Sequence, residues 1–338
     1  MATSAPTATG RPLAALARLR EPWTDRRAEL VLGAVSCFVL ALIVGMVVFV
    51  FSKAWPSFSH NGLGWFGDTG NVNQQMDRIQ QPGTAEPVYD FGAFDLIWGT
   101  VLTTGVAVLF GAAFSTLAAI FMVEFAPESL RRILTPTVSL LAAVPSVIYG
   151  LIGILVLAPF VGDLISQDRK ESVAGVISLT GENWLLATFI LAVMIIPIMT
   201  AIIAQALRQV PRGWTEGAAA LGVNRWRVMW TISVRTARPA IVAGAVLATG
   251  RALGEAIMLA MVSGGTAFAP NPVDGLTFFL EPTRPLAATI VFYREGLANP
   301  AMASTLYGIA AVLLVSAMAL SIGAYVVKQP MKKYGIRT

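Results

Sequence analysis

One charged pair stands out because it lies deep inside an apolar stretch of the chain. Arg251 is near the middle of the stretch from Pro239 to Val262, and Glu255 follows one helical turn later. A charged side chain at the centre of a membrane helix costs at least about 3 kcal/mol, so such residues usually face a bundle interior or a water-filled cavity. In an unbroken helix, four-residue spacing places both side chains on one face, where they partly neutralise each other.

The residues alone leave two interpretations of this pair open. In the first, Arg251 faces a translocation route and offers its planar guanidinium fork to a passing tetrahedral oxyanion. Glu255 then moderates the positive charge, since an anion held too tightly would not be released. In the second, the pair is a structural ion pair that fixes one helix against another. The first is favoured because charges inside a membrane mark functional sites by default.

Small residues accompany the pair and predict close helix packing. Gly250 and Gly254 form a G-x-x-x-G step, and Gly111, Ser115 and Ala119 form a similar stripe in an earlier apolar stretch. Small side chains let helix backbones approach each other in lipid. Both sets are therefore predicted to be contact surfaces between helices.

Prolines predict kinks in two other apolar stretches. Pro136 and Pro145 lie in one stretch and Pro197 in another, and each removes a helix hydrogen bond. The hydroxyl groups of Ser146 and Thr200 are placed to bond carbonyl groups that the prolines release. Such kinks serve gating or only shape the bundle, and both interpretations stay open.

A basic segment, residues 208–238, separates the fourth and fifth apolar stretches. It contains Glu216-Gly-Ala-Ala-Ala-Leu-Gly222, in which the alanines favour a short helix and Gly222 can end it and turn the chain. We expect a helix and a turn, held at the membrane surface, that fit a groove in a cytoplasmic partner. An ordinary connecting loop is the alternative.

The apolar stretches themselves predict an all-α, polytopic membrane protein with six transmembrane helices. Each can cross a bilayer core, which needs about 20 helical residues, and none alternates as barrel strands do. The predicted spans are 30–51, 96–123, 133–161, 184–207, 239–262 and 301–327. Around them we expect a leader at 1–29 with a disordered tip, a permease domain at 30–328, and a tail at 329–338. External loops are expected at 53–92, 162–183 and 264–300.

Lys and Arg residues predict the orientation of these spans. Seventeen lie before the first span, in the segments that follow the second and fourth spans, and in the tail, whereas six lie on the other face. Cytoplasmic loops carry the excess of Lys and Arg. Both termini are therefore expected in the cytoplasm.

Composition excludes several other classes of protein. Hydrophobic residues make up 56% of the chain and charged residues only 13%, and Cys37 is the single cysteine, so neither a disulfide framework nor a cysteine metal site is possible. The net charge of +5 is spread over loops, which gives no nucleic-acid surface. The stretch from Gly62 to Gly67 matches G-x-G-x-x-G by chance, since no strand precedes it, and no phosphate-binding P-loop is present. We expect no catalytic residue, metal or cofactor in this chain.

Several motifs together resemble the permeases of ABC importers. The segment from Gln209 to Pro239 is similar to their EAA loop at Glu216, Ala218, Gly222, Ile232 and Val234, although Gly217 replaces an Ala and Arg235 replaces a Pro. Three further strings resemble the phosphate-importer (Pst) permeases, the last especially the PstC-type subunit. They are Ala142-Ala-Val-Pro-Ser-Val-Ile-Tyr-Gly150, Met194-Ile-Ile-Pro-Ile198 and Gly250-Arg-Ala-Leu-Gly-Glu255.

The resemblance implies a machine of several subunits in the bacterial cytoplasmic membrane, with a type I importer fold. It implies a second, PstA-type permease, a PstB-type ATPase dimer that binds ATP and Mg, and an external PstS-type phosphate-binding protein. The loop residues Glu216, Ala218, Ala219 and Gly222 would couple to the ATPase, and Arg251 and Glu255 match charged positions on the family's phosphate route.

Three alternatives to this function are weighed. In the first alternative, the chain is the permease of an ABC importer for another oxyanion or a small solute. A gradient-driven secondary transporter is the second, but it predicts inverted repeats and more acidic residues in the spans than this chain has. A scaffold without transport is the third, and it gives no reason for Arg251 at mid-membrane.

Overall fold

The computed structural model describes residues 22–67, 71–80, 88–172, 178–267 and 269–331, and nearly all of them are helical. Within these ranges the only extended pairing is an isolated bridge between Gly264 and Thr283. The chain divides into a unit of residues 1–49 and a unit of residues 50–338. The tip of the predicted leader and residues 332–338 of the predicted tail lie outside the described residues.

Helix α2, Pro22–Asn61, runs across this division and is longer than the predicted span 30–51. From Arg27 to Met46 its side chains are exposed on all sides, with Leu30 67% and Phe38 63% exposed. A helix that is apolar all round suits a position inside a membrane or against another protein. The first predicted span is thus confirmed as a helix.

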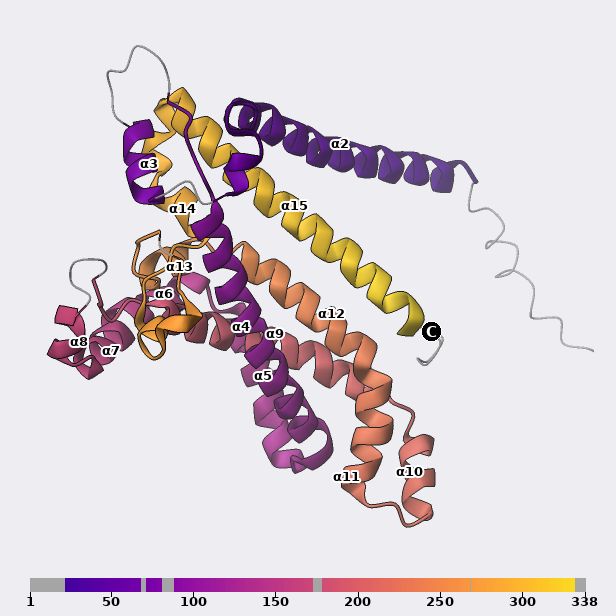
Figure 1. Cartoon of the computed structure of the whole chain (residues 1–338). Coiled ribbons are helices and arrows are strands. Elements are labelled where there is room, and N and C mark those ends of the chain that lie inside the picture. The colour runs from indigo at the N-terminus through magenta and orange to yellow at the C-terminus, as the bar shows by residue number, and fades with distance from the viewer. Residues whose placement is uncertain (1–21, 68–70, 81–87, 173–177, 268, 332–338) are drawn as a thin grey trace, which may run out of the picture. The chain divides into compact units, whose positions relative to one another are not determined.

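The centre of the second unit is formed by α4, Phe94–Ile120, and α9, Trp184–Arg208, which pack along their length (Figure 1). The predicted small-residue stripe of α4 makes this contact: Ser115 and Ala119 are fully buried, and a Cβ added to Gly111 would lie 3.0 Å from Ile195. The Ser115 hydroxyl donates to the carbonyl of Ile196 at 3.0 Å. The packing role predicted for this stripe is confirmed.

Helix α5, Glu128–Ala143, and helix α6, Ser146–Ile152, replace the single span predicted at 133–161. The break lies at Val144 and Pro145, both of which have extended backbone angles. Because proline disfavours the helical conformation of the residue before it, the kink expected at Pro145 is a complete break. A π-helical segment, η4 (Gly153–Leu157), and α7, Ala158–Leu164, continue the chain from α6.

Two further helices, α12 (Val234–Leu253) and α13 (Ile257–Val262), replace the single span predicted at 239–262. The last predicted span is continuous as α15, Pro300–Met331. Among the described residues, five helices are long and apolar enough to cross a membrane, and the broken pair α12 and α13 occupies the place of the sixth predicted span. This agrees with the predicted six-helix fold.

The predicted loops contain more helix than expected. Residues 53–92 include the end of α2, the 3₁₀ helix η2 (Gly62–Phe66) and α3 (Val72–Gln80), while α8 (Gln167–Ser172) lies in the next loop. The 264–300 loop holds η6 (Pro272–Asp274), η7 (Thr277–Leu280), α14 (Leu286–Phe292) and η8 (Arg294–Ala298). The G-x-G-x-x-G match lies in and beside η2, where Trp65 is fully buried, so it is no dinucleotide loop.

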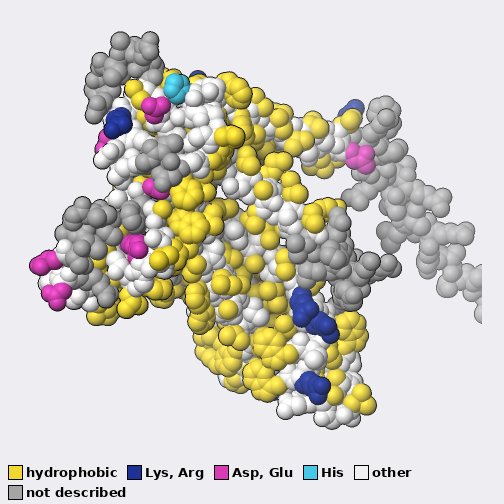
Figure 2. Space-filling view, in the orientation of Figure 1, with side chains coloured by type: hydrophobic (Ala, Val, Ile, Leu, Met, Phe, Trp, Pro, Cys, Tyr) yellow, Lys and Arg dark blue, Asp and Glu magenta, His cyan; other side chains and the backbone are white. Residues whose placement is uncertain are grey.

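The ends of the second unit differ in character. At one end, called here the α10 end, α4 and α9 finish beside α10 (Arg212–Ala220) and α11 (Arg225–Val228). At the other, called the α14 end, α4 and α9 begin beside the 264–286 segment. Figure 2 shows hydrophobic side chains over much of the visible face and Lys and Arg side chains at the α10 end.

Candidate functional site

The predicted charged pair lies at the break between α12 and α13. Helix α12 ends at Leu253, and the amides of Gly254 and Glu255 turn back to the carbonyls of Arg251 and Ala252, each at 3.2 Å. Arg251 is therefore in the last helical turn, where a cation is stabilised by the negative end of the helix dipole. Glu255 lies outside both helices.

This break overturns the prediction that the pair shares one helix face. Arg251 is exposed, whereas Glu255 is only 8% exposed, and no ion pair joins them in the described structure. The prediction assumed a helix that continues through Gly254, and the helix ends there instead. The guanidinium of Arg251 thus keeps its donors available to a ligand or a partner.

Within the described part of the chain, Gly250 and Gly254 do not pack against another helix. A Cβ added to Gly250 would meet nothing within 4 Å, and one added to Gly254 would meet only carbonyls of its own helix end. The packing role stays a prediction, since its partner helix can belong to another subunit. The open surface at Gly250 lies next to Arg251 and leaves room for a neighbouring molecule.

The basic segment 208–238, called here the coupling segment after its predicted role, has the helix and the turn that its sequence predicts. Glu216, Ala218 and Ala219 lie on α10, and Gly222 follows with a φ of +74°. The amide of Gly222 donates to the Ala219 carbonyl at 2.9 Å, and the amide of Val223 donates to the Ala218 carbonyl at 3.2 Å. This double hydrogen bond is the Schellman motif, in which a glycine with positive φ closes the helix.

The far side of this turn is equally well defined. The Asn224 side chain accepts from the amide of Trp226 at 2.9 Å and so begins α11. Leu221, between the two helices, is 85% exposed, and Trp214 is 49% exposed. An exposed tryptophan near the start of α10 and an exposed leucine in the turn at its end offer apolar side chains for contact with a partner.

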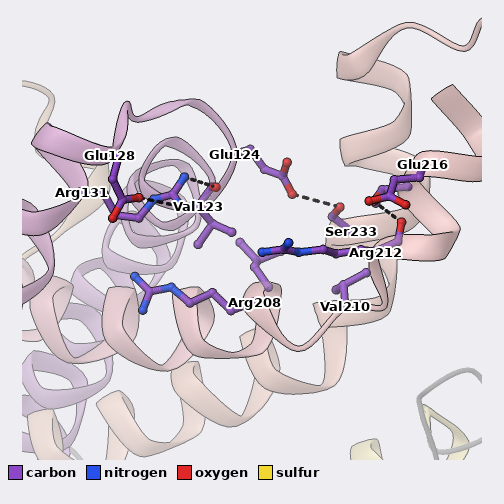
Figure 3. Close-up of a pocket in the computed structure, with 11 residues that line it drawn as sticks. Val123, Glu124, Glu128, Arg131, Arg208, Val210, Arg212, Glu216 and Ser233 are labelled. Carbon is purple, nitrogen blue, oxygen red and sulfur yellow. Dashed lines mark hydrogen bonds and ion pairs between the residues drawn. The ribbon is translucent and has the colours of Figure 1, made fainter.

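A pocket of about 620 Å³ lies between α10 and the ends of α4, α5 and α9 (Figure 3). Figure 3 shows Glu128 and Arg131 on one side of this space and Glu216 on the other. It is lined by Val123, Glu124, Glu128, Arg131, Leu207, Arg208, Val210, Arg212, Thr215, Glu216 and Ser233. Among the described residues, no three His, Cys, Asp or Glu side chains are grouped to hold a metal ion.

Two π-helical segments border this pocket. They are η3, Phe121–Phe125, which ends α4, and η5, Met229–Ser233, which precedes α12. The Ser233 hydroxyl and the Glu124 carboxylate lie 3.3 Å apart and connect them. Such segments occur often at functional sites, and this contact joins the start of α12 to the end of α4.

Arg131 has a role that the sequence did not reveal. Its guanidinium donates to the carbonyls of Met122, Val123 and Ala126 at 3.1, 3.0 and 3.3 Å. These carbonyls lack partners at the end of a helix, so Arg131 stabilises the end of η3. From the sequence Arg131 served only as a sign of orientation, although a basic residue just after a helix end is a known signal of capping.

The prolines differ in their effects. Pro145 interrupts the helix between α5 and α6, and Ser146 is the first residue of α6. Helix α9, in contrast, continues through Pro197. The Thr200 hydroxyl donates to the carbonyl of Ile196 at 2.8 Å, not to that of Val193, which Pro197 leaves without its usual donor. The prediction that Thr200 replaces the lost bond is wrong, because the hydroxyl reaches the carbonyl of its own preceding turn.

Comparison with known proteins gives a consistent result. The model of a family described as "Binding-protein-dependent transport system inner membrane component" matches residues 111–330. The probable ABC transporter permease YqgH of Bacillus subtilis is 32% identical over 249 residues, which are 73% of this chain and 74% of that one. The probable phosphate permease PstC of Methanocaldococcus jannaschii is 30% identical over 299 residues, which are 86% and 90% of the two chains.

Solved structures share the fold. A chain of a bacterial alginate ABC transporter matches with a TM-score of 0.54 and 17% identity, over 93% of this chain and 99% of that one. A chain of the MetNI methionine ABC transporter, in an inward-facing conformation, matches with a TM-score of 0.51 and 17% identity, over 69% and 93%. At these identities the similarity concerns the fold and not the cargo.

Proposed function

Because the chain belongs to the family of inner membrane components of binding-protein-dependent transport systems, we propose that it is the permease subunit that passes phosphate in an ATP-driven importer. The exposed guanidinium of Arg251, at the end of a helix that breaks inside its membrane crossing, carries this proposal. Curated relatives named as PstC phosphate permeases support the cargo, including one from Xylella fastidiosa with 31% identity over 73% of this chain.

The chemistry of Arg251 fits a tetrahedral oxyanion. A guanidinium offers five N–H donors in a planar fork and stays charged at any physiological pH, so it can bond two oxygens of one anion. Discontinuous helices supply substrate sites in many transporters, since a break exposes polar backbone near mid-membrane. Glu255 is buried beside the break, where its carboxylate lowers the positive potential near Arg251 without forming an ion pair with it.

The coupling segment transmits the motion of a separate ATPase. Helix α10 and its Schellman turn form a rigid plug, and the exposed Leu221 and Trp214 present apolar contacts to a groove in that partner. The pocket of about 620 Å³ behind α10 leaves room for the helix to shift against the ends of α4 and α9. Displacement of α10 would move α12 through α11 and η5, the two elements that connect them in the chain.

The partners and orientation follow from this assignment. The α10 end faces the cytoplasm together with both termini, and the α14 end faces outward. A PstB-type ATPase dimer binds at the α10 end, a PstS-type phosphate-binding protein delivers phosphate at the α14 end, and a PstA-type permease completes the pathway beside Gly250 and Arg251. The alginate and methionine transporters have the same fold, so the cargo depends on side chains such as Arg251.

The test is ATP-dependent uptake of labelled phosphate into membrane vesicles that carry the full complex. We expect Arg251→Ala to assemble but to lower uptake at least about tenfold, since one hydrogen bond to a charged group contributes about 1.5–3 kcal/mol. Arg251→Lys keeps the charge but loses the planar guanidinium, so its phosphate uptake should lie between that of wild type and that of Arg251→Ala. Arg294→Ala is the matched control, because that side chain is 64% exposed.

Competing anions decide the cargo. Unlabelled phosphate should reduce the uptake, whereas sulfate and molybdate at the same concentration should not. Normal uptake by Arg251→Ala would show that the arginine is structural, and preference for sulfate or molybdate would reassign the cargo.

A further inference from the structure

The α14 end concentrates buried polar atoms that have no hydrogen-bond partner. Six such side-chain atoms occur among the described residues, although buried polar groups in proteins are nearly always paired. All six belong to the first three turns of α4, the first two turns of α9, or the segment from Ser263 to Arg284, which meet at this end (Figure 1). They are Thr103 Oγ1, Trp184 Nε1, Thr188 Oγ1, Ser263 Oγ, Thr283 Oγ1 and Arg284 Nε.

Ser263 and Thr283 are held side by side by the backbone. The amide of Thr283 donates to the Ser263 carbonyl at 2.8 Å, next to the bridge between Gly264 and Thr283. Helix α4 lies against Thr283 at Gly99, where an added Cβ would lie 2.4 Å from Thr283 Oγ1. Both hydroxyl groups are fully buried, so neither can find bulk water.

Arg284 follows directly and is buried without a counter-ion. It is 7% exposed, and no carboxylate of the described residues lies within ion-pair distance. Its guanidinium lies over the rings of Phe292 and Tyr293, at 4.7 and 5.3 Å from their centroids. It donates to the Gly265 carbonyl and, at 3.2 Å, to the Tyr293 hydroxyl. Of its five N–H donors, Nε–H and two others therefore remain unused.

The nearest acid in the sequence does not compensate this charge. Glu281 is 2% exposed, and its carboxylate accepts from the amide of Asn271 at 3.0 Å. Burial also raises the pKa of Glu281, which favours its neutral form. A buried arginine that cannot lose its proton and has no anionic partner is costly, so an anion that joins it is strongly favoured.

We propose that Arg284, with the hydroxyl groups of Ser263 and Thr283, forms a second oxyanion site at the α14 end, separate from Arg251. The guanidinium supplies charge and two or more donors, and the two hydroxyl groups supply donors that no protein atom now uses. The choice of phosphate as the anion rests on the function proposed above. The site would hold the anion at the entrance before it reaches Arg251.

The test is equilibrium dialysis of labelled phosphate against the purified complex in lipid nanodiscs, without the external binding protein. The Arg251→Ala background removes the other candidate site. We expect this background to bind phosphate, and added Arg284→Gln to weaken binding about tenfold or more. The matched control is Arg294→Gln, on the same loop but exposed and paired with Glu295, which should bind as the background does.

A second variant keeps the test decisive if Arg284→Gln does not assemble. Ser263→Ala with Thr283→Val removes both hydroxyl groups and leaves the charge and most of the volume, so it should weaken binding about tenfold while the complex stays intact. Binding that is absent from the Arg251→Ala background, or unchanged in the hydroxyl variant, would overturn the second site.

Uptake measured on the same preparations separates this inference from the proposed function. Phosphate uptake by the wild-type complex, together with dialysis that is insensitive to Arg284 and to the hydroxyl groups, would reject the second site alone. A wild-type complex that transports no phosphate but shows binding dependent on Arg284 would reject the proposed cargo and keep the site.

Discussion

Gly222 allows a quantitative test of the coupling turn. Its φ of +74° is a left-handed conformation, and an added Cβ would meet nothing within 4 Å, so Gly222→Ala introduces backbone strain without a clash. That strain costs about 1–2 kcal/mol for a residue other than glycine. The substitution should therefore destabilise the two hydrogen bonds that close α10, from the amides of Gly222 and Val223.

Hydrogen exchange of the assembled complex measures this cost. A loss of about 1–2 kcal/mol raises the open population of the turn by about 5–30-fold, so the amides of residues 222 and 223 should exchange faster by that factor. Gly217→Ala is the matched control, because Gly217 lies within α10, also has open space around it and has no positive φ. It should slow exchange, since alanine stabilises a helix by about 1 kcal/mol relative to glycine.

The reasoning would be refuted by two results. One is unchanged exchange at residues 222 and 223 in Gly222→Ala, which would show that the turn is not held by its backbone conformation. The other is faster exchange in Gly217→Ala, which would show that any side chain added to α10 disturbs it. If the turn must be rigid to transmit motion, ATP-dependent uptake should fall in Gly222→Ala and not in Gly217→Ala.

Two further predictions concern stability. Arg131→Gln should lower the free energy of unfolding, measured by thermal unfolding, by about 1.5–3 kcal/mol, because three carbonyls lose a charged donor. Arg132→Gln, at the exposed neighbouring residue, should change this free energy by less than about 1 kcal/mol. Equal effects of the two substitutions would contradict the capping role. Burial raises the pKa of Glu281 above its ordinary 4.5, so the stabilising protonated form is fully present at low pH and is lost as the pH rises through the raised pKa. Glu281→Gln should therefore unfold at a higher temperature than wild type at about pH 8, and the difference should narrow towards about pH 5; a difference independent of pH would contradict this.

The sequence predicted those parts of the fold that depend on local pattern. Long apolar stretches gave the crossings, and the small-residue stripe at Gly111 and Ser115 identified the face of α4 that packs on α9. The Ala-rich segment before Gly222 gave α10 and its turn, because both the helix propensity and the glycine act locally.

Features that depend on tertiary packing were not predictable in the same way. Glycine is common in membrane helices, so Gly254 gave no sign that α12 would end there. Because the helix ends before Glu255, the predicted placement of Arg251 and Glu255 on one helix face was wrong. Arg284 was counted only as a loop cation, since its burial depends on contacts with Gly265 and with the rings of Phe292 and Tyr293. Pro145 was recognised as a local disturbance, but its pattern did not distinguish a kink from a break.

The carbonyl of Ile196, which accepts from both the Ser115 and the Thr200 hydroxyl groups, has a mechanical consequence. It fastens α4 to α9 one residue before Pro197, where α9 would otherwise be weakest. The two unbroken helices thus form a rigid central pair. The interruptions at Val144–Pro145 and Gly254–Ala256 are the positions where the other helices can change direction. If α10 couples to an ATPase as proposed, we expect its displacement to rotate the broken helices, which carry the charged side chains, and not to bend the central pair.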